Sequence, residues 1–156
     1  MGQILLSIGS TEFLDGRIHG ENVMLHKTVI PRGTKLRRIN LSRKTAPCLR
    51  CGQISKRHSI GTRHLREVGI SAPVILEVIY SKHYCTKCRK HFSLPMEHLA
   101  QPSGRFTNRV RRTAMGMVLD LSMTLEKASQ RMRQKYYVHV PATTLHEWCS
   151  METKLD

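Results

Sequence analysis

Four of the five cysteines form two C-x-x-C pairs, a pattern that is typical of metal binding. The first pair is Cys48 and Cys51, the second is Cys85 and Cys88, and 33 residues lie between the pairs. Four thiolates with Zn–S distances of about 2.3 Å complete a tetrahedral zinc shell and leave no position for water. We therefore predict one Zn²⁺ site with a structural role.

Two other interpretations of the cysteines are open: reduced core thiols without a metal, and a redox dithiol. A redox site needs only one pair at a helix N-terminus, so two matched pairs favour the metal. Because four thiolates already fill the shell, we expect the nearby histidines at the surface or facing phosphate. The fifth cysteine, Cys149, is next to Trp148 and is predicted to be a core or half-buried thiol. The histidines concerned are His58, His64, His83, His91 and His98.

The cysteine pairs require a small β module to hold them, which we place at residues 47–100. Gly52 follows the first pair, where a positive φ turns backbone amides toward a metal-bound sulfur. Residues 74–80 read VILEVIY and predict a strand that leads to the second pair. Phe92 is expected to pack beneath the metal loop. Aromatic residues make up only 5% of the chain, which favours a zinc-ribbon-like module over one large core.

The chain has a strongly basic balance, with 26 Lys and Arg against 11 Asp and Glu and a formal net charge of +15. No acidic residue lies between Glu21 and Glu67. A basic block of that length indicates a polyanionic partner, most often nucleic acid, although a solvated basic face is the simpler alternative. Residues 1–46 are interpreted as a weakly structured basic arm with short strands, whose second half docks on the β module and lines phosphate.

Residues 101–104 read QPSG and predict a linker, after which residues 105–156 predict three helices. Thr107 and Thr124 are the expected N-caps of the first two helices, and Pro141 suits the start of the third. Three short helices in this order favour a helix-turn-helix, with a generic three-helix unit as the alternative. The predicted fold class is α+β. The residues expected to face inward are Val110, Ala114, Met117, Val118, Leu121, Leu125, Ala128, Met132, Leu145, Trp148 and Met151.

The order of these motifs resembles the N-terminal zinc-binding and helix-turn-helix region of transposases of the ISL-three insertion-sequence family. The resemblance covers about residues 46–150, and a weaker likeness exists to the small regulatory proteins of other insertion sequences. The motifs that carry it are CLRCG at 48–52, RHLRE at 63–67, YCTKC at 84–88, Phe92, RFT at 105–107 and TTLHEW at 143–148.

The resemblance implies binding to double-stranded DNA at transposon ends. Complete family members also carry a catalytic domain whose acidic residues hold divalent metal. No such triad can be built from the acids on or beside the predicted helices, so we expect no catalysis and interpret the chain as a truncated or N-terminal part of a transposase. These acids are Asp120, Glu126, Glu147, Glu152 and Asp156.

The expected DNA contacts come from the arm, the β module and the helices. An RNA-binding zinc ribbon and a protein-interaction module are the alternative functions, and a homodimer or assembly with other transposase chains is left open. We expect no small-molecule substrate. The predicted DNA-contacting residues are Arg37, Arg38, Arg43, Lys44, Arg57, Arg63, Arg66, Arg105, Arg109, Arg112, Thr143, Thr144 and His146.

The beginning of the chain lacks the features of a signal peptide. Residues 1–8 have no basic segment and only a short apolar run, and no later segment approaches the roughly 20 apolar residues of a membrane span. We therefore expect a cytoplasmic protein without membrane contacts, where reducing conditions favour metal thiolates over disulfides.

Overall fold

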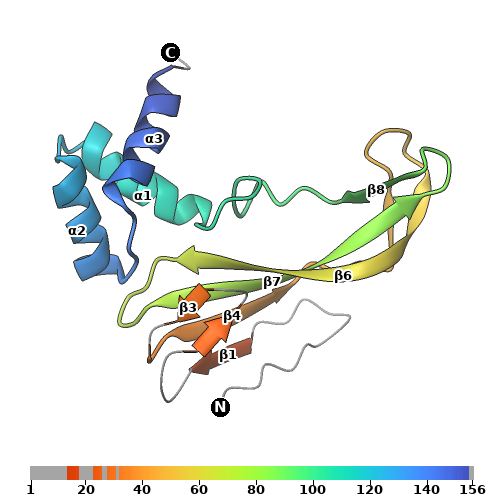
Figure 1. Cartoon of the computed structure of the whole chain (residues 1–156), viewed down its shortest axis with the longest axis horizontal. Coiled ribbons are helices and arrows are strands. Elements are labelled where there is room, and N and C mark those ends of the chain that lie inside the picture. Colours follow the sequence, from red (N-terminus) through yellow and green to blue (C-terminus); the bar gives the residue numbers. More distant parts are fainter. Residues whose placement is uncertain (1–13, 18–22, 26–27, 31, 155–156) are drawn as a thin grey trace.

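The computed structural model describes residues 14–17, 23–25, 28–30 and 32–154. The chain is α+β, with strands in its first two thirds and three helices after them (Figure 1). The strands are β1 (Leu14–Arg17), β2 (Val23–Leu25), β3 (Thr28–Ile30), β4 (Lys35–Asn40), β5 (Thr45–Pro47), β6 (Ile54–Glu67), β7 (Val74–Cys85) and β8 (Lys90–Ser93). The helices are α1 (Asn108–Leu119), α2 (Leu125–Tyr136) and α3 (Ala142–Thr153).

A long antiparallel hairpin of β6 and β7 is the centre of the main sheet. The strand order is β1-β4-β7-β6-β5, and β8 pairs with the far end of β7. The sheet is mixed, because β4 runs parallel to β7 while the other pairs are antiparallel. The predicted strand at residues 74–80 is confirmed and continues to Cys85. Its dense apolar sequence suits a central strand that is covered on both faces.

One face of the sheet is covered by the segment that leads to the helices. Ile39, Leu65, Leu76, Val78 and Ala100 form a buried cluster. The half-buried side chains of the covering segment that pack against this cluster include Met96 and Leu99.

The expected weakly structured arm does not hold for residues 35–40, which form β4 inside the sheet. Lys35 to Asn40 pair in register with Val74 to Ile79 of β7. Because successive side chains of a strand point to opposite faces, Leu36 and Arg38 share one face of β4, and Arg37 and Ile39 share the other. The basic residues of this segment therefore face two different environments.

The helices begin where their caps were predicted. The Thr107 and Thr124 hydroxyls accept hydrogen bonds from the amides of Val110 and Lys127, and Pro141 is the N-cap residue of α3. The predicted inward positions Val110, Ala114, Met117, Ala128, Met132 and Leu145 are buried in one cluster, and Val118, Leu125 and Trp148 pack against it.

Two predicted inward residues are wrong. Leu121 lies beyond the end of α1 and is 65% exposed, and Met151 on α3 is 54% exposed. Cys149 is buried in the helical cluster, as a core thiol was expected to be. The error at α3 arises because the C-terminal end of the helix extends past α1 (Figure 1), so Met151 lies beyond the part of the helix that buries Leu145 and Cys149.

Residues 101–104 are attached to the sheet. The Arg63 guanidinium donates hydrogen bonds to the carbonyl oxygens of Gln101 and Gly104. Next to it, the Arg66 amide donates to the Arg105 carbonyl at 2.8 Å, and the Thr107 hydroxyl donates to the buried Glu67 carboxylate at 2.8 Å. The helices therefore dock against the end of the β6–β7 hairpin.

Gly69, in the turn between β6 and β7, makes a second connection to the helices. Its amide donates to the Tyr136 carbonyl at the end of α2, at 2.8 Å. A Cβ at this position would lie 2.0 Å from the carbonyl oxygen of Ala72. We expect Gly69→Ala to lower the free energy of unfolding by about 1–3 kcal/mol, because the turn must move to admit a methyl group.

Urea denaturation of Gly69→Ala measures this cost. Ser71→Ala in the same turn is the matched control, because the Ser71 side chain is exposed and the new side chain adds no atoms. Equal stability of the two variants would show that the turn adjusts without cost.

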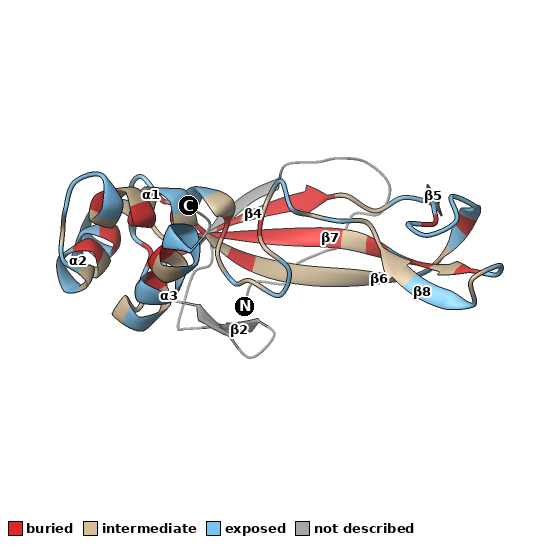
Figure 2. Ribbon diagram, turned by 90° about the horizontal axis from the view of Figure 1, so that it is seen from above, coloured by how far each residue is buried: buried red, intermediate tan, exposed pale blue. Residues whose placement is uncertain are grey.

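The helices and the cysteine-bearing turns lie at opposite ends of an elongated molecule (Figure 2). Strands β6 and β7 span the distance between them, and the buried part of the sheet lies in the middle (Figure 2). No helix in the described part of the chain has the length and apolar character to cross a membrane.

Candidate metal centre

Two neighbouring turns carry the four cysteines. Cys48 and Cys51 lie between β5 and β6, and Cys85 and Cys88 lie at the turn from β7 to β8. The first turn is closed by the Cys48 amide, which donates to the Gln53 carbonyl, and by the Gly52 amide, which donates to the Cys48 carbonyl, both at 2.9 Å. Gly52 adopts a φ of +77°, which confirms the predicted positive φ.

The four sulfur atoms have the spacing of a tetrahedral metal shell. All four lie within 4.8 Å of one another, with 3.9 Å between the Sγ atoms of Cys48 and Cys88 and 3.6 Å between those of Cys51 and Cys85. A regular tetrahedron with Zn–S bonds of about 2.3 Å has sulfur atoms about 3.8 Å apart. The four cysteines therefore can hold one metal ion, as the sequence predicted.

Backbone amides stabilise negative charge on two of the sulfurs. The Arg50 amide donates to Cys48 Sγ and the Cys88 amide donates to Cys85 Sγ, each at 3.4 Å. Hydrogen bonds from the backbone amides of Cys51 and Arg50 lower the pKa of Cys48. The amide of Cys88 similarly lowers the pKa of Cys85 to about 6.

The fourth thiol shows the opposite effect. Its hydrogen bond with Cys51, together with burial, raises the pKa of Cys88 to about 12. Four thiolates at this distance repel one another, so a bound cation is needed before all four lose their protons. The arrangement favours a doubly charged, sulfur-preferring ion, and zinc fits this donor set.

A buried histidine supports the metal end of the sheet without joining the shell. His83 is fully buried, its Nε2 lies 2.8 Å from Ser81 Oγ and its Nδ1 lies 3.2 Å from the Ser55 carbonyl. Its ring stacks on Phe92 with centroids 5.4 Å apart. Phe92 therefore packs on β7, against a residue two positions before Cys85. Among the described residues, the four cysteines are the one group of three or more His, Cys, Asp or Glu side chains that lie close enough to share a metal.

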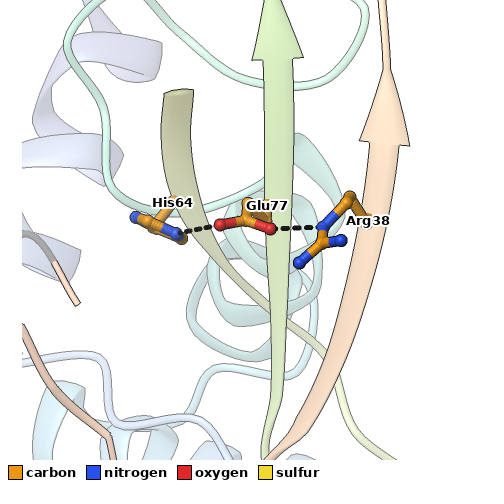
Figure 3. A network of polar contacts seen from close by, with 3 residues as sticks. All are labelled: Arg38, His64 and Glu77. Carbon is orange, nitrogen blue, oxygen red and sulfur yellow. Dashed lines mark hydrogen bonds and ion pairs between the residues drawn. The ribbon is translucent and has the colours of Figure 1, made fainter. Parts of the chain in front are cut away.

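Three polar side chains, Arg38, His64 and Glu77, form a buried network in the centre of the sheet (Figure 3). Glu77 on β7 accepts a hydrogen bond from Arg38 Nε on β4 at 2.6 Å, and its other oxygen lies 3.1 Å from His64 Nε2 on β6. Burial raises the pKa of Glu77, but the hydrogen bonds from His64 and Arg38 outweigh it and the net pKa is lowered.

Because of this network, Arg38, one of the predicted DNA-contacting residues, lies inside the fold rather than at its surface. Arg38 is 6% exposed and its guanidinium binds Glu77 across the sheet. Arg63 is likewise bound within the fold, because its guanidinium donates hydrogen bonds to the carbonyl oxygens of Gln101 and Gly104. Sequence reasoning missed both roles because the partners are distant in the chain.

The remaining predicted DNA-contacting residues fall into two groups. Near the metal end, the Arg57 amide donates to the Lys44 carbonyl at 2.9 Å, which places these two residues side by side with Arg43 preceding them. At the helical end, Arg66 and Arg105 are joined through their backbones. Exposed predicted residues are Arg43, Lys44, Arg105, Arg109, Arg112, Thr143 and His146, whereas Arg37, Arg57, Arg66 and Thr144 are half-buried.

Helix α2 contributes exposed basic residues that the predicted set omitted, namely Lys127, Arg131, Arg133 and Lys135. In contrast, α3 carries Glu147 and Glu152 among its exposed side chains and no Lys or Arg within its bounds. The high density of Lys and Arg in the segment KASQRMRQK at 127–135 could have indicated this basic helix from the sequence.

Comparisons with known proteins leave the family open. No protein-family model, curated protein or solved structure matches the chain.

Proposed function

We propose that this chain is a zinc-stabilised protein that binds double-stranded DNA. The observation that carries the proposal is the exposed positive charge at both ends of the elongated sheet and helix unit, in Arg43 and Lys44 at one end and in Arg105, Arg109 and Arg112 at the other. Phosphate contacts of this kind supply affinity and position a protein on the duplex.

The metal supports this function indirectly. It closes the two cysteine turns as a zinc ribbon, and the β6–β7 hairpin then holds the basic segment around Lys44 at a fixed place relative to the helices. The three helices serve as a helix-turn-helix, in which the exposed Thr143 and His146 of α3 contribute base contacts.

We further propose that the chain contains the DNA-recognising region of an ISL-three-type transposase, which binds transposon-end DNA. The cysteine motifs and their order before the helices support this family proposal. Selection of bound sequences from a random duplex pool, with metal-free protein as the control, tests it: enrichment of one sequence supports recognition of a transposon end.

Duplex affinity is expected to fall steeply with salt. A protein that neutralises about five phosphates has a slope of roughly −4 to −5 in a plot of log affinity against log salt concentration. We expect Lys44→Gln to reduce this slope by about 0.9, because one phosphate contact is lost. Fluorescence anisotropy of a labelled duplex at several salt concentrations measures both values.

Lys154→Gln is the matched control, because Lys154 is exposed at the end of α3 and outside both basic groups. It removes the same charge and should leave the slope unchanged. Affinity that hardly responds to salt, or equal slopes for the two variants, would contradict phosphate-based DNA binding.

One observation favours RNA as a second candidate partner. On the sheet face near the metal end, the His91 ring lies 4.7 Å from that of His58 and 4.9 Å from that of Tyr84. Both histidines are exposed, and exposed rings of this kind stack unpaired bases. Competition between duplex DNA and a structured RNA with single-stranded loops separates the two candidates.

A further inference from the structure

A cavity of about 360 Å³ lies where the helices dock on the sheet. It is lined by β6, by the segment before α1, by the N-terminal half of α1, and by residues 141, 144 and 148 at and after the start of α3. Its size is within the range of small-ligand sites, which begin at about 300 Å³. The lining residues that matter for its chemistry are Arg66, Arg105, Phe106, Arg111, Thr144 and Trp148.

Three arginines line this cavity, and no acidic residue is among the described residues that line it. In the part of the chain that the structure describes, none of the three forms an ion pair with a carboxylate. Arg111 Nε is buried and has no hydrogen-bond acceptor there. Three arginine side chains at one cavity repel one another, so an anion with several acceptor oxygens would stabilise the cavity.

Two aromatic side chains form another part of the wall. Phe106 and Trp148 meet edge to face, with ring centroids 5.4 Å apart, and the Arg66 guanidinium lies 5.7 Å from the centre of the Phe106 ring. Both rings are half-buried. The Thr144 side chain and the Asn108 side chain at the rim add polar groups. The cavity therefore combines positive charge with an aromatic wall.

We infer that this cavity binds an unpaired nucleotide, with the phosphate at the three guanidinium groups and the base against Phe106 and Trp148. A nucleotide joins an anion with several acceptor oxygens to a planar ring, which are the two features that the cavity walls match. A base within a duplex is stacked and paired, so it cannot enter the cavity without leaving the helix. The site thus goes beyond duplex binding through exposed phosphate contacts.

Trp148 is the single tryptophan of the chain, so its fluorescence reports directly on the cavity. Titration of the full, metal-loaded chain with thymidine 5′-monophosphate is expected to give a saturable change in tryptophan emission. Excitation at the red edge of the tryptophan absorption band avoids absorption by the nucleotide base. Thymidine, which lacks the phosphate, should bind at least roughly tenfold more weakly, because it makes no charge-assisted hydrogen bonds. Inorganic phosphate should also bind more weakly than the nucleotide, because it makes no contact with the rings.

Arg105→Gln and Arg109→Gln form a matched pair of variants. Both arginines are exposed, and only Arg105 lines the cavity. Arg105→Gln should weaken nucleotide binding by roughly tenfold, the usual effect of losing a hydrogen bond to a charged group. Arg109→Gln should leave the affinity for the nucleotide unchanged. Metal content and circular dichroism confirm that both variants are folded.

Three results would overturn the inference: equal affinities for thymidine and its monophosphate, inorganic phosphate binding as tightly as the nucleotide, or equal effects of the two substitutions. Duplex binding is measured separately by its salt dependence. If the unsubstituted chain binds duplex DNA but shows no response to the nucleotide, the cavity site alone is rejected. If it responds to the nucleotide but does not bind duplex DNA, the proposed function alone is rejected.

Discussion

Replacing Cys85 with serine is expected to abolish metal binding and to unfold the metal end of the sheet. Cys85 is fully buried and belongs to both β7 and the four-sulfur cluster. Binding of a structural zinc ion contributes on the order of 10 kcal/mol or more, which is as large as the whole stability of many small domains. The turns around Cys48 and Cys88 have few buried apolar residues that would hold them together without the metal.

Elemental analysis and chemical denaturation measure this effect. The unsubstituted chain should contain one zinc ion per chain, and removing the ion with a chelator should reproduce the behaviour of Cys85→Ser. Hydrogen exchange should show that protection is lost first in β5, β8 and the adjoining end of the β6–β7 hairpin. The helices bury their own cluster and should keep most of their protection.

Cys149→Ser is the matched control for the metal prediction. Cys149 is a buried thiol of α3 and lies in the helical cluster, outside the four-sulfur group. Its replacement buries a hydroxyl and should cost about 1–3 kcal/mol, with the metal content unchanged. A well-folded, unsubstituted chain without zinc, or a Cys85→Ser variant that keeps one metal ion per chain, would contradict a four-thiolate centre.

The substitution Glu77→Gln is expected to lower the free energy of unfolding by about 3–5 kcal/mol, because it removes the charge that neutralises buried Arg38. Glu77 is 4% exposed and contacts Arg38 and His64 from the central strand (Figure 3). The amide keeps the shape of the side chain, so the cost comes from the loss of negative charge. Glu97→Gln is the control, since Glu97 is exposed and its loss should change stability by less than about 0.5 kcal/mol.

The same carboxylate makes stability depend on pH. The pKa of Glu77 is lower in the folded chain than its ordinary value, because hydrogen bonds from His64 and Arg38 outweigh the effect of burial. Its contribution is therefore fully present above the ordinary pKa of a glutamate and is lost as the pH falls through the lowered pKa. Denaturation at a series of acidic pH values should show this loss in the unsubstituted chain and in Glu97→Gln. If Glu77→Gln has the same slope in this range, the carboxylate does not stabilise the sheet in this way.

Residues 37 and 38 show why the basic surface could be predicted only in part. Arg37 and Arg38 are neighbours of the same type, and nothing in the local sequence separates them. In β4, successive side chains point to opposite faces, and the parallel register places Arg38 opposite Glu77, 39 residues later in the chain. A buried ion pair thus takes the place of the expected phosphate contact.

The four-cysteine group and the starts of the helices are marked by short sequence motifs, which is why the sequence alone was enough to predict them. The two C-x-x-C spacings specify the number and type of metal ligands, and threonine at a helix start satisfies amides only two or three residues away. Tertiary structure decided the features that join distant segments: the position of β4, the docking of residues 101–104, and the cavity of Arg66, Arg105 and Arg111. These features depend on the long pairing of β6 with β7, which brings distant segments together. The same folding buries Arg38 against Glu77 and binds Arg63 to the carbonyl oxygens of Gln101 and Gly104, so only the other basic residues are left to form a basic surface.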